Sequence, residues 1–169
     1  MNKFDFDWYD FNRSLVFCWP TGVGKTYKAN EIIDRYTSEK IRQVMRTYKT
    51  SDAYFKQMVK SNLLCLRSHE DWSTPYDKYP LEMMMRCWVL LYDDIWVSDV
   101  SDAYLRDFTF IIDERAKKWL PTIFTTNLNK DELIKKLNER IVSRIMYNAD
   151  IVVFEWEDKR LATTKYYWS

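Results

Sequence analysis

The stretch that decides the fold of this chain reads Trp19-Pro20-Thr21-Gly22-Val23-Gly24-Lys25-Thr26. An apolar run, residues 15–18, precedes it, and residues 27–36 after it have the character of a helix. The order strand, tight loop and helix is the setting of a phosphate-binding loop. Backbone N–H groups of such a loop, together with the N-terminus of the helix, form a nest for anionic oxygens. We therefore expect phosphate groups to bind here.

Two side chains of this loop have specific expected roles. Lys25 would reach the terminal phosphates of a nucleotide, and the hydroxyl of Thr26 would ligate Mg²⁺. The pattern G-x-x-x-x-G-K-[ST] has glycine at position 19, where this chain has Trp19. Glycine is used there because the chain turns sharply close to the phosphates. The residues expected to surround the nucleotide are Pro20, Thr21, Gly22, Val23, Gly24, Lys25, Thr26 and Tyr27.

Length and composition restrict the class of protein. The 169 residues fit one domain, and 47% hydrophobic and 30% charged residues are typical of a soluble globular protein. The net charge of +1 gives no overall attraction to nucleic acid or membrane, so any DNA contact would need a local patch. The sequence shows no signal peptide and no apolar run long enough to span a bilayer. Three cysteines without ligand spacing indicate reduced residues in a cytoplasmic protein: Cys18, Cys65 and Cys87.

Hydrophobic periodicity predicts alternating strands and helices after an aromatic and acidic arm, residues 1–13. This arm could pack near the nucleotide base, bind a partner, or form a loosely packed lead-in. A helix over residues 51–66 would have Ser51 near its N-cap, and residues 67–80 would form a loop. The expected strands are residues 15–18, 41–47, 87–94, 121–127, 151–156 and 161–167, the last two able to form a hairpin. The other expected helices are residues 102–118, 131–137 and 140–146.

Two adjacent carboxylates, Asp93 and Asp94, follow the continuous apolar run of residues 87–92. Such a run indicates a buried parallel strand, and open α/β sheets bind ligands at the carboxyl ends of their strands. We expect Asp93 to hold Mg²⁺, mostly through water, and Asp94 to polarise the water that attacks the γ-phosphate. Asn127, which ends the next expected strand, could orient that water by a hydrogen bond.

Four segments in this order resemble the AAA+ ATPase core: residues 19–26, 89–94, 125–127 and 139–145. They are similar to that family's Walker A, Walker B, sensor 1 and the box carrying its arginine finger. The narrower resemblance is to bacterial replicative helicase loaders of the DnaC type and to their transposition-helper relatives of the IstB type. The segments that carry it are residues 93–95, 112–115, 120–128 and 138–144.

The resemblance implies ATP hydrolysis with Mg²⁺ at a site between two subunits. Lys25, Thr26, Asp93, Asp94 and Asn127 would act within one chain. Arg144 would match the arginine finger that stabilises transition-state charge in a neighbouring subunit, and Arg140 is the second candidate. The alternative for both arginines is surface ion pairing with Glu139 or Asp131.

The implied architecture is a three-layer α/β P-loop NTPase of the AAA+ core type. Residues 1–169 would form this single domain, a mostly parallel five-stranded sheet with helices on both faces and no C-terminal lid domain. The implied partners are ATP, further copies of the chain, a replicative helicase and single-stranded DNA. A transposase is the alternative partner. If Trp19 is genuine, a nucleotide-dependent interaction module that does not hydrolyse ATP becomes a further alternative.

The tryptophans suggest a common cause. The chain has 2 glycines and 8 tryptophans, whereas average usage would give roughly twelve glycines. Trp19 stands where the loop pattern has glycine, and Trp96 and Trp119 stand where the resembling proteins typically have glycine. We hypothesise that these residues are glycines encoded by UGA. The alternative is an aromatic-rich, divergent protein with a degraded loop.

Overall fold

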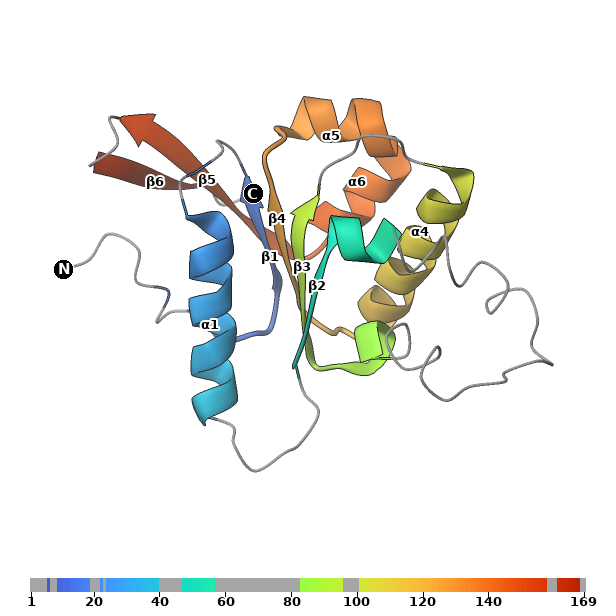
Figure 1. Cartoon of the computed structure of the whole chain (residues 1–169), viewed down its shortest axis with the longest axis horizontal. Helices are drawn as coiled ribbons and strands as arrows, with labels where there is room; N and C mark the ends of the chain where they lie inside the picture. The colour runs from blue at the N-terminus through green and yellow to red at the C-terminus, as the bar shows by residue number, and fades with distance from the viewer. Residues whose placement is uncertain are drawn as a thin grey trace.

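A central sheet of six strands organises the chain, in the order β2-β3-β4-β1-β5-β6 (Figure 1). The computed structural model describes residues 6, 9–18, 22, 24–39, 47–56, 83–95, 101–157 and 161–167. The first five strands of that order are parallel, and β6 pairs antiparallel with β5. The predicted parallel sheet is therefore present, extended by the predicted terminal hairpin. The strands are β1 (Ser14–Cys18), β2 (Thr47–Ser51), β3 (Val89–Ile95), β4 (Thr122–Thr126), β5 (Ala149–Glu157) and β6 (Leu161–Tyr167).

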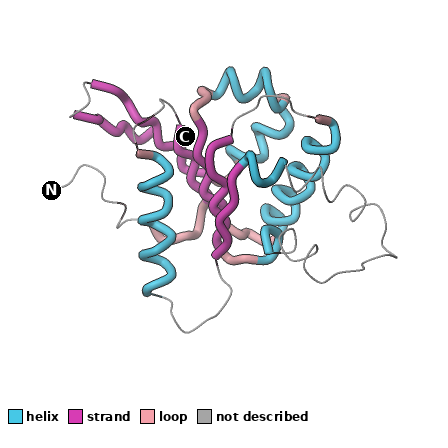
Figure 2. The backbone as a smooth tube through the Cα atoms, in the orientation of Figure 1, coloured by secondary structure: helices cyan, strands magenta, loops and turns pink. Residues whose placement is uncertain are grey.

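Helices cover both faces of this sheet, as predicted (Figure 2). One face is covered by α1 (Lys25–Glu39), which contacts β3 and β4. The other face carries α4 (Asp102–Lys117), α5 (Lys130–Leu137) and α6 (Glu139–Met146), and α6 contacts β1 and β5. Residues 52–56 and 83–86 are also helical. The result is the three-layer α/β arrangement expected from the alternating sequence pattern.

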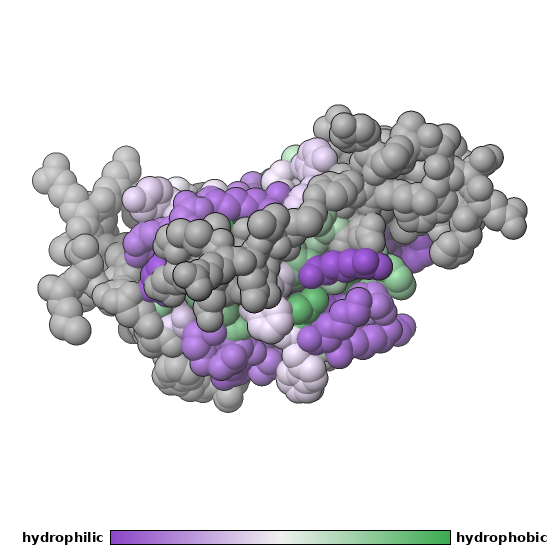
Figure 3. Space-filling view, turned by 90° about the horizontal axis from the view of Figure 1, so that it is seen from below, coloured by the Kyte–Doolittle hydropathy of each residue, from purple (hydrophilic) through white to green (hydrophobic). Residues whose placement is uncertain are grey.

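The core consists of two apolar clusters, one on each face of the sheet. Because successive side chains of a strand point to opposite faces, β1 contributes Leu15 and Phe17 to the α1 side and Val16 to the other. The strand is buried on both faces, which explains its continuous apolar run. Seen from below, the coloured surface alternates between hydrophilic and small hydrophobic areas (Figure 3).

The described residues of the N-terminal arm belong to this core. Phe6, Tyr9 and Phe11 are buried in the cluster beneath α1. Arg35 of α1 donates a hydrogen bond of 2.6 Å to the Phe6 carbonyl oxygen, and the Tyr9 hydroxyl donates one of 2.6 Å to the Arg13 carbonyl oxygen. The idea of a loosely packed lead-in is therefore wrong for these three aromatic residues.

The second strand was predicted at residues 41–47, but β2 spans Thr47–Ser51. Residues 41–46 lie outside the described part of the chain. The strand is polar and has no apolar pattern that could mark it in the sequence. Parallel pairing with β3, in which Thr50 lies opposite Tyr92, holds it in the sheet. The helix after it begins as predicted, since the Tyr54 N–H donates to the Ser51 hydroxyl at 3.3 Å. Residues 57–80, which include most of the helix predicted at residues 51–66 and the predicted loop at residues 67–80, are not described.

Caps fix the starts of the helices on the second face. The Ser101 hydroxyl accepts from the Tyr104 N–H at the start of α4. Asn129 and Glu132 form a reciprocal capping box at the start of α5. Asn138 ends α5 and caps α6 by accepting from the Ile141 N–H. These side chains bind N–H groups that have no partner inside the helix, so the sequence sets each boundary.

Arg115 joins the end of α4 to the starts of β3 and β4. Its side chain is 1% exposed. The guanidinium donates hydrogen bonds to the carbonyl oxygens of Met84, Cys87 and Pro121, at 2.7, 2.9 and 2.6 Å, and to the Thr122 hydroxyl at 2.8 Å. Buried carbonyl groups need such partners, so this side chain stabilises the amino edge of the sheet.

The described cysteines agree with the prediction of reduced core residues. Cys18 and Cys87 are buried and free, and Cys65 lies outside the described residues. Burial raises the pKa of the Cys18 thiol to about 12. Within the described part of the chain, no helix is long and apolar enough to cross a bilayer.

Candidate nucleotide-binding site

The predicted site residues come together because strands with parallel register end at one edge of the sheet. Cys18 of β1 is paired with Thr126 of β4, and Ser51 of β2 is paired with Asp93 of β3. At this edge β1 ends at Cys18 and α1 begins at Lys25 (Figure 1). The edge is therefore formed by four segments that are far apart in the sequence.

The two loop glycines have backbone conformations that favour glycine. Gly22 has φ +75° and Gly24 has φ +85°, both in the left-handed region. A Cβ atom at either position would meet no heavy atom within 4 Å, so conformation and not space selects glycine here. Left-handed residues next to a helix start are the basis of backbone anion nests. Residues 19–21 and 23, which include the predicted Pro20, Thr21 and Val23, lie outside the described residues.

Lys25, the first residue of α1, is directed to the sheet edge. Its side chain is 6% exposed, and its Nζ donates to Asn127 Oδ1 at 2.8 Å. The Asn127 amide nitrogen in turn donates to Asp94 Oδ1 at 3.0 Å. Burial lowers the pKa of Lys25, while the nearby charges of Asp94 and Asp93 act in the opposite direction. Tyr27, the other helical residue predicted to line the nucleotide, is exposed on the first turn.

Three oxygen-bearing side chains surround the predicted metal position. The hydroxyls of Thr26 and Thr125 both donate to Asp93 Oδ1, at 2.8 and 2.7 Å. Hydroxyl and carboxylate oxygens suit Mg²⁺, which binds through few protein ligands and completes its shell with water and phosphate. Among the described residues no group of three or more His, Cys, Asp or Glu side chains could hold a metal ion. The hydroxyl and carboxylate oxygens of Thr26 and Asp93 fit Mg²⁺ that is shared with a phosphate substrate.

Asp94 occupies an irregular position in β3. The pairing of β3 with β4 shifts in register between Tyr92 and Ile95, and Asp94 has φ +55°. Its N–H donates to the Thr125 hydroxyl at 2.7 Å, which holds this conformation. Partial burial, and then the negative charges of Asp93 and Asp52, raise the pKa of the Asp94 carboxyl, while Lys25 lowers it. A carboxylate with a raised pKa is a better proton acceptor near neutral pH.

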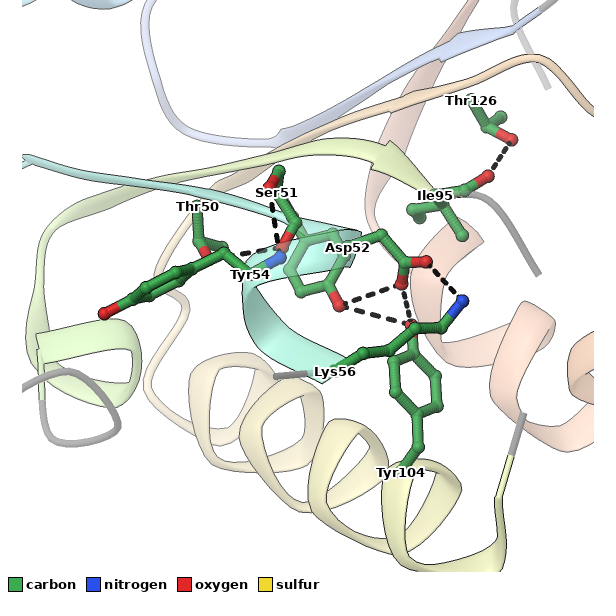
Figure 4. Close-up of polar contacts among 9 residues, drawn as sticks. Thr50, Ser51, Asp52, Tyr54, Lys56, Ile95, Tyr104 and Thr126 are labelled. Carbon is green, nitrogen blue, oxygen red and sulfur yellow. Dashed lines mark hydrogen bonds and ion pairs between the residues drawn. The ribbon is translucent and has the colours of Figure 1, made fainter. Parts of the chain in front are cut away.

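Asp52 forms a polar cluster with Tyr104 and Lys56, which the sequence alone did not reveal (Figure 4). It is buried and accepts hydrogen bonds from the hydroxyls of Tyr104, at 2.5 Å, and Tyr92, at 3.3 Å. Lys56 neutralises it at 2.8 Å. Because Tyr92 directly precedes Asp93, this cluster anchors the end of β3 from the second face of the sheet.

A cavity of about 400 Å³ opens beside Asp93. The cavity is lined by polar, aromatic and apolar side chains from α1, β2, the helical turn after β2, and β3. The lining residues are Asn30, Tyr48, Lys49, Thr50, Ser51, Tyr54, Leu91 and Asp93. Open space therefore adjoins the predicted metal position.

Thr125 is a site residue to which the sequence analysis assigned no individual role. Its hydroxyl contacts both Asp93 and the Asp94 backbone, so Thr125→Val should misplace both carboxylates while keeping the side-chain shape. In chains that carry Trp19→Gly, we expect Mg²⁺-dependent ATP turnover to fall roughly ten- to a hundredfold, since two hydrogen bonds are lost. Thr125→Ser, which keeps the hydroxyl, should retain most of the turnover. Equal turnover in the Val and Ser variants would contradict this role.

Arg144 and Arg140 are not part of this edge of their own chain. Arg144 of α6 forms an ion pair with Asp113 of α4, and not with the expected Glu139 or Asp131. It lines a small cavity with Ser14 and Thr122, at the amino edge of the sheet. Its Nη1 is buried without a hydrogen-bond partner among the described residues. Arg140 is exposed. That either residue acts on a neighbouring subunit remains a prediction.

The strand order of the sheet, with two carboxylates at the end of β3, matches the AAA+ P-loop NTPase fold. No family model matches the sequence, and no curated protein matches it significantly. Solved structures do match. The DnaC helicase loader has a TM-score of 0.69 at 23% identity, over 86% of this chain and 80% of DnaC. DnaI has a TM-score of 0.63 at 23% identity, over 86% of this chain and 76% of DnaI.

A third similar structure is the replication initiator DnaA bound to AMPPCP and single-stranded DNA. Its TM-score is 0.65 at 18% identity, over 88% of this chain and 42% of that one. Identities this low establish shared fold only. The predicted AAA+ core fold, which the DnaC loader and DnaA share, is confirmed at that level.

Proposed function

We propose that this chain binds and hydrolyses ATP with Mg²⁺, and that it acts in DNA replication as a helicase-loader-like factor. One observation carries the ATPase proposal. The Thr26 hydroxyl donates directly to Asp93, and Lys25 is linked to Asp94 through the Asn127 amide. The Thr125 hydroxyl of β4 also donates to Asp93. The start of α1, the end of β3 and the end of β4 thus bring together a cation, ligands for a metal ion and a base, as phosphoryl transfer to water requires.

Each side chain has a distinct part in this proposal. The loop N–H groups and Lys25 bind the phosphates, and Thr26 and Asp93 hold Mg²⁺. Bound Mg²⁺ would neutralise phosphate charge. Asp94 accepts a hydrogen bond from the attacking water, and Asn127 fixes the Asp94 carboxylate by its amide hydrogen bond of 3.0 Å. Asp52 and its two tyrosines keep the end of β3 in position.

The replication role is supported by fold similarity to DnaC and DnaI. The partners that follow from it are a replicative hexameric helicase, single-stranded DNA and further copies of this chain, in a soluble protein of the cytoplasm. Co-purification with the helicase encoded in the same genome tests the partner, with a transposase from that genome as the comparison. Association with the transposase alone would replace the loader proposal by a transposition-helper role.

Mixing variants tests whether Arg144 acts on a neighbouring subunit. Arg144→Ala chains lack the proposed finger, and Lys25→Ala chains lack the loop lysine, so each variant should be nearly inactive alone. Each variant keeps the residue that the other lacks. We expect a mixture of the two to recover ATP turnover, since the Lys25→Ala chain supplies the missing arginine. The loss in Arg144→Ala alone should be about a thousandfold, typical of an arginine finger.

Two controls separate this role from the ion pair within the chain. Asp113→Ala removes the partner of Arg144 but keeps the arginine, and should retain turnover. Arg140→Ala should also retain it. Recovery with Arg140→Ala chains, and none with Arg144→Ala chains, would assign the finger to Arg140. Failure of every mixture would contradict a shared site. All chains carry Trp19→Gly, since the loop pattern requires glycine there.

A further inference from the structure

We infer that the natural protein carries glycine at positions 119 and 19, encoded by UGA, so that its phosphate-binding loop is complete. The inference for position 119 rests on backbone geometry and on the composition of the chain. The inference for position 19 extends it to the site and rests on the proposed function, because it takes the loop to bind phosphate.

The end of α4 has the hydrogen-bond pattern of a Schellman motif. The Trp119 N–H donates to the Ala116 carbonyl oxygen at 3.1 Å, and the Leu120 N–H donates to the Arg115 carbonyl oxygen at 3.0 Å. Trp119 is the residue directly after the C-cap Lys118, and its φ is +55°. In this motif that position takes the left-handed conformation and is usually glycine.

Trp119 lacks the short polar side chain and the buried packing that make a left-handed residue tolerable. Among the described residues, Asp94, Asn138 and Asn148 also have positive φ, but their short polar side chains tolerate it. Phe11 has φ +62° and is buried, with its ring 4.5 Å from that of Tyr9, so core packing can offset its strain. Trp119 is bulky and 65% exposed, and its ring contact is with Tyr147, itself 60% exposed, at a centroid distance of 6.4 Å. The backbone at this position therefore selects glycine, and the indole ring contributes little in return.

The composition points to the same substitution. Reading a UGA glycine codon as tryptophan removes one glycine and adds one tryptophan each time. The chain has 2 glycines where roughly twelve are expected, and 8 tryptophans. Glycines encoded by ordinary codons would be unaffected, which explains why Gly22 and Gly24 remain. The loop pattern has glycine at positions 19 and 24. Gly24 is present, whereas position 19 is Trp19.

Thermal unfolding tests the geometric part. Trp119→Gly should raise Tm by about 2–6 °C, because it removes the cost of a left-handed bulky residue. Trp119→Ala also removes the indole but keeps a Cβ, and should give little or no rise. Trp88→Gly is the matched control, since Trp88 is 45% exposed and lies outside the left-handed region. The Trp88→Gly chain should have the same Tm as the parent chain, or a lower one. A Trp119→Gly chain no more stable than Trp119→Ala would overturn the argument from geometry.

The codons at positions 19, 96 and 119, and the masses of the corresponding peptides from the natural source, test the identity directly. Trp96, the third tryptophan of the hypothesis, lies outside the described residues. UGA codons with glycine masses are expected. UGG codons or tryptophan masses would overturn the inference. These outcomes are independent of the proposed function. Glycine at position 19 with no ATP binding would refute the ATPase alone, whereas UGG at position 19 with Lys25-dependent turnover would refute this inference alone.

Discussion

Lys25→Ala is expected to reduce ATP turnover at least about a hundredfold, the loss typical of removing one group that stabilises transition-state charge. The side chain is 6% exposed and is held at the sheet edge by Asn127, so a change here acts directly on the site. Steady-state phosphate release from chains carrying Trp19→Gly measures the effect. The fold should remain, because Lys25 lies at a helix start and outside both apolar clusters.

Lys28→Ala is the matched control for this prediction. Lys28 lies on the first turn of the same helix and forms an ion pair of 2.9 Å with the exposed Glu31. Its Nζ also lies 5.7 Å from the ring centre of Phe6. Its loss should change turnover less than twofold, since its side-chain contacts are with Glu31 and Phe6 and not with the site residues. Equal turnover in Lys25→Ala and in the parent would contradict the site. Equal inactivity of both, with helicase binding retained, would instead indicate a module that binds nucleotide without hydrolysing it.

Arg115→Met is expected to cause the largest loss of stability, about 3–5 kcal/mol, because it leaves several buried carbonyl oxygens without donors. Methionine keeps much of the side-chain volume, so the loss would report on the hydrogen bonds to Met84, Cys87 and Pro121. Denaturant unfolding measures the free energy, and Tm should fall by on the order of 10 °C.

Lys117→Met makes a comparable change two residues further along α4. The Lys117 side chain is 69% exposed and pairs with Glu114 at 2.8 Å. Its replacement should alter the free energy of unfolding by no more than about 0.5 kcal/mol. If the two variants were equally stable, the proposed structural role of Arg115 would be wrong.

Local patterns explain what could be predicted from the sequence. The phosphate loop lies between an apolar strand and a helix, so its place at the sheet edge followed from neighbouring residues. The apolar run before Asp93 and Asp94 fixed the carboxyl end of β3 in the same way. Asn127 follows the next buried strand, and the structure brings it to Lys25 and Asp94. Each of these expectations needed only the rule that parallel strands end at one edge.

Contacts that depend on register between distant segments could not be predicted. Thr125 meets Asp93 only because β3 and β4 pair with an irregularity after Tyr92. Asp52 meets Tyr104 across the second face, from segments far apart in the chain. The prediction for the second strand, residues 41–47, was wrong because β2 is polar and depends on its pairing with β3. No local pattern marks any of these partners.

Binding of ATP to the Trp19→Gly chain, followed by titration calorimetry with and without Mg²⁺, tests the central claim most directly. The account predicts saturable binding of one ATP per chain that is strengthened by Mg²⁺ and lost in Lys25→Ala. A folded Trp19→Gly chain that binds no ATP, or that binds it equally well after Lys25→Ala, would contradict the account.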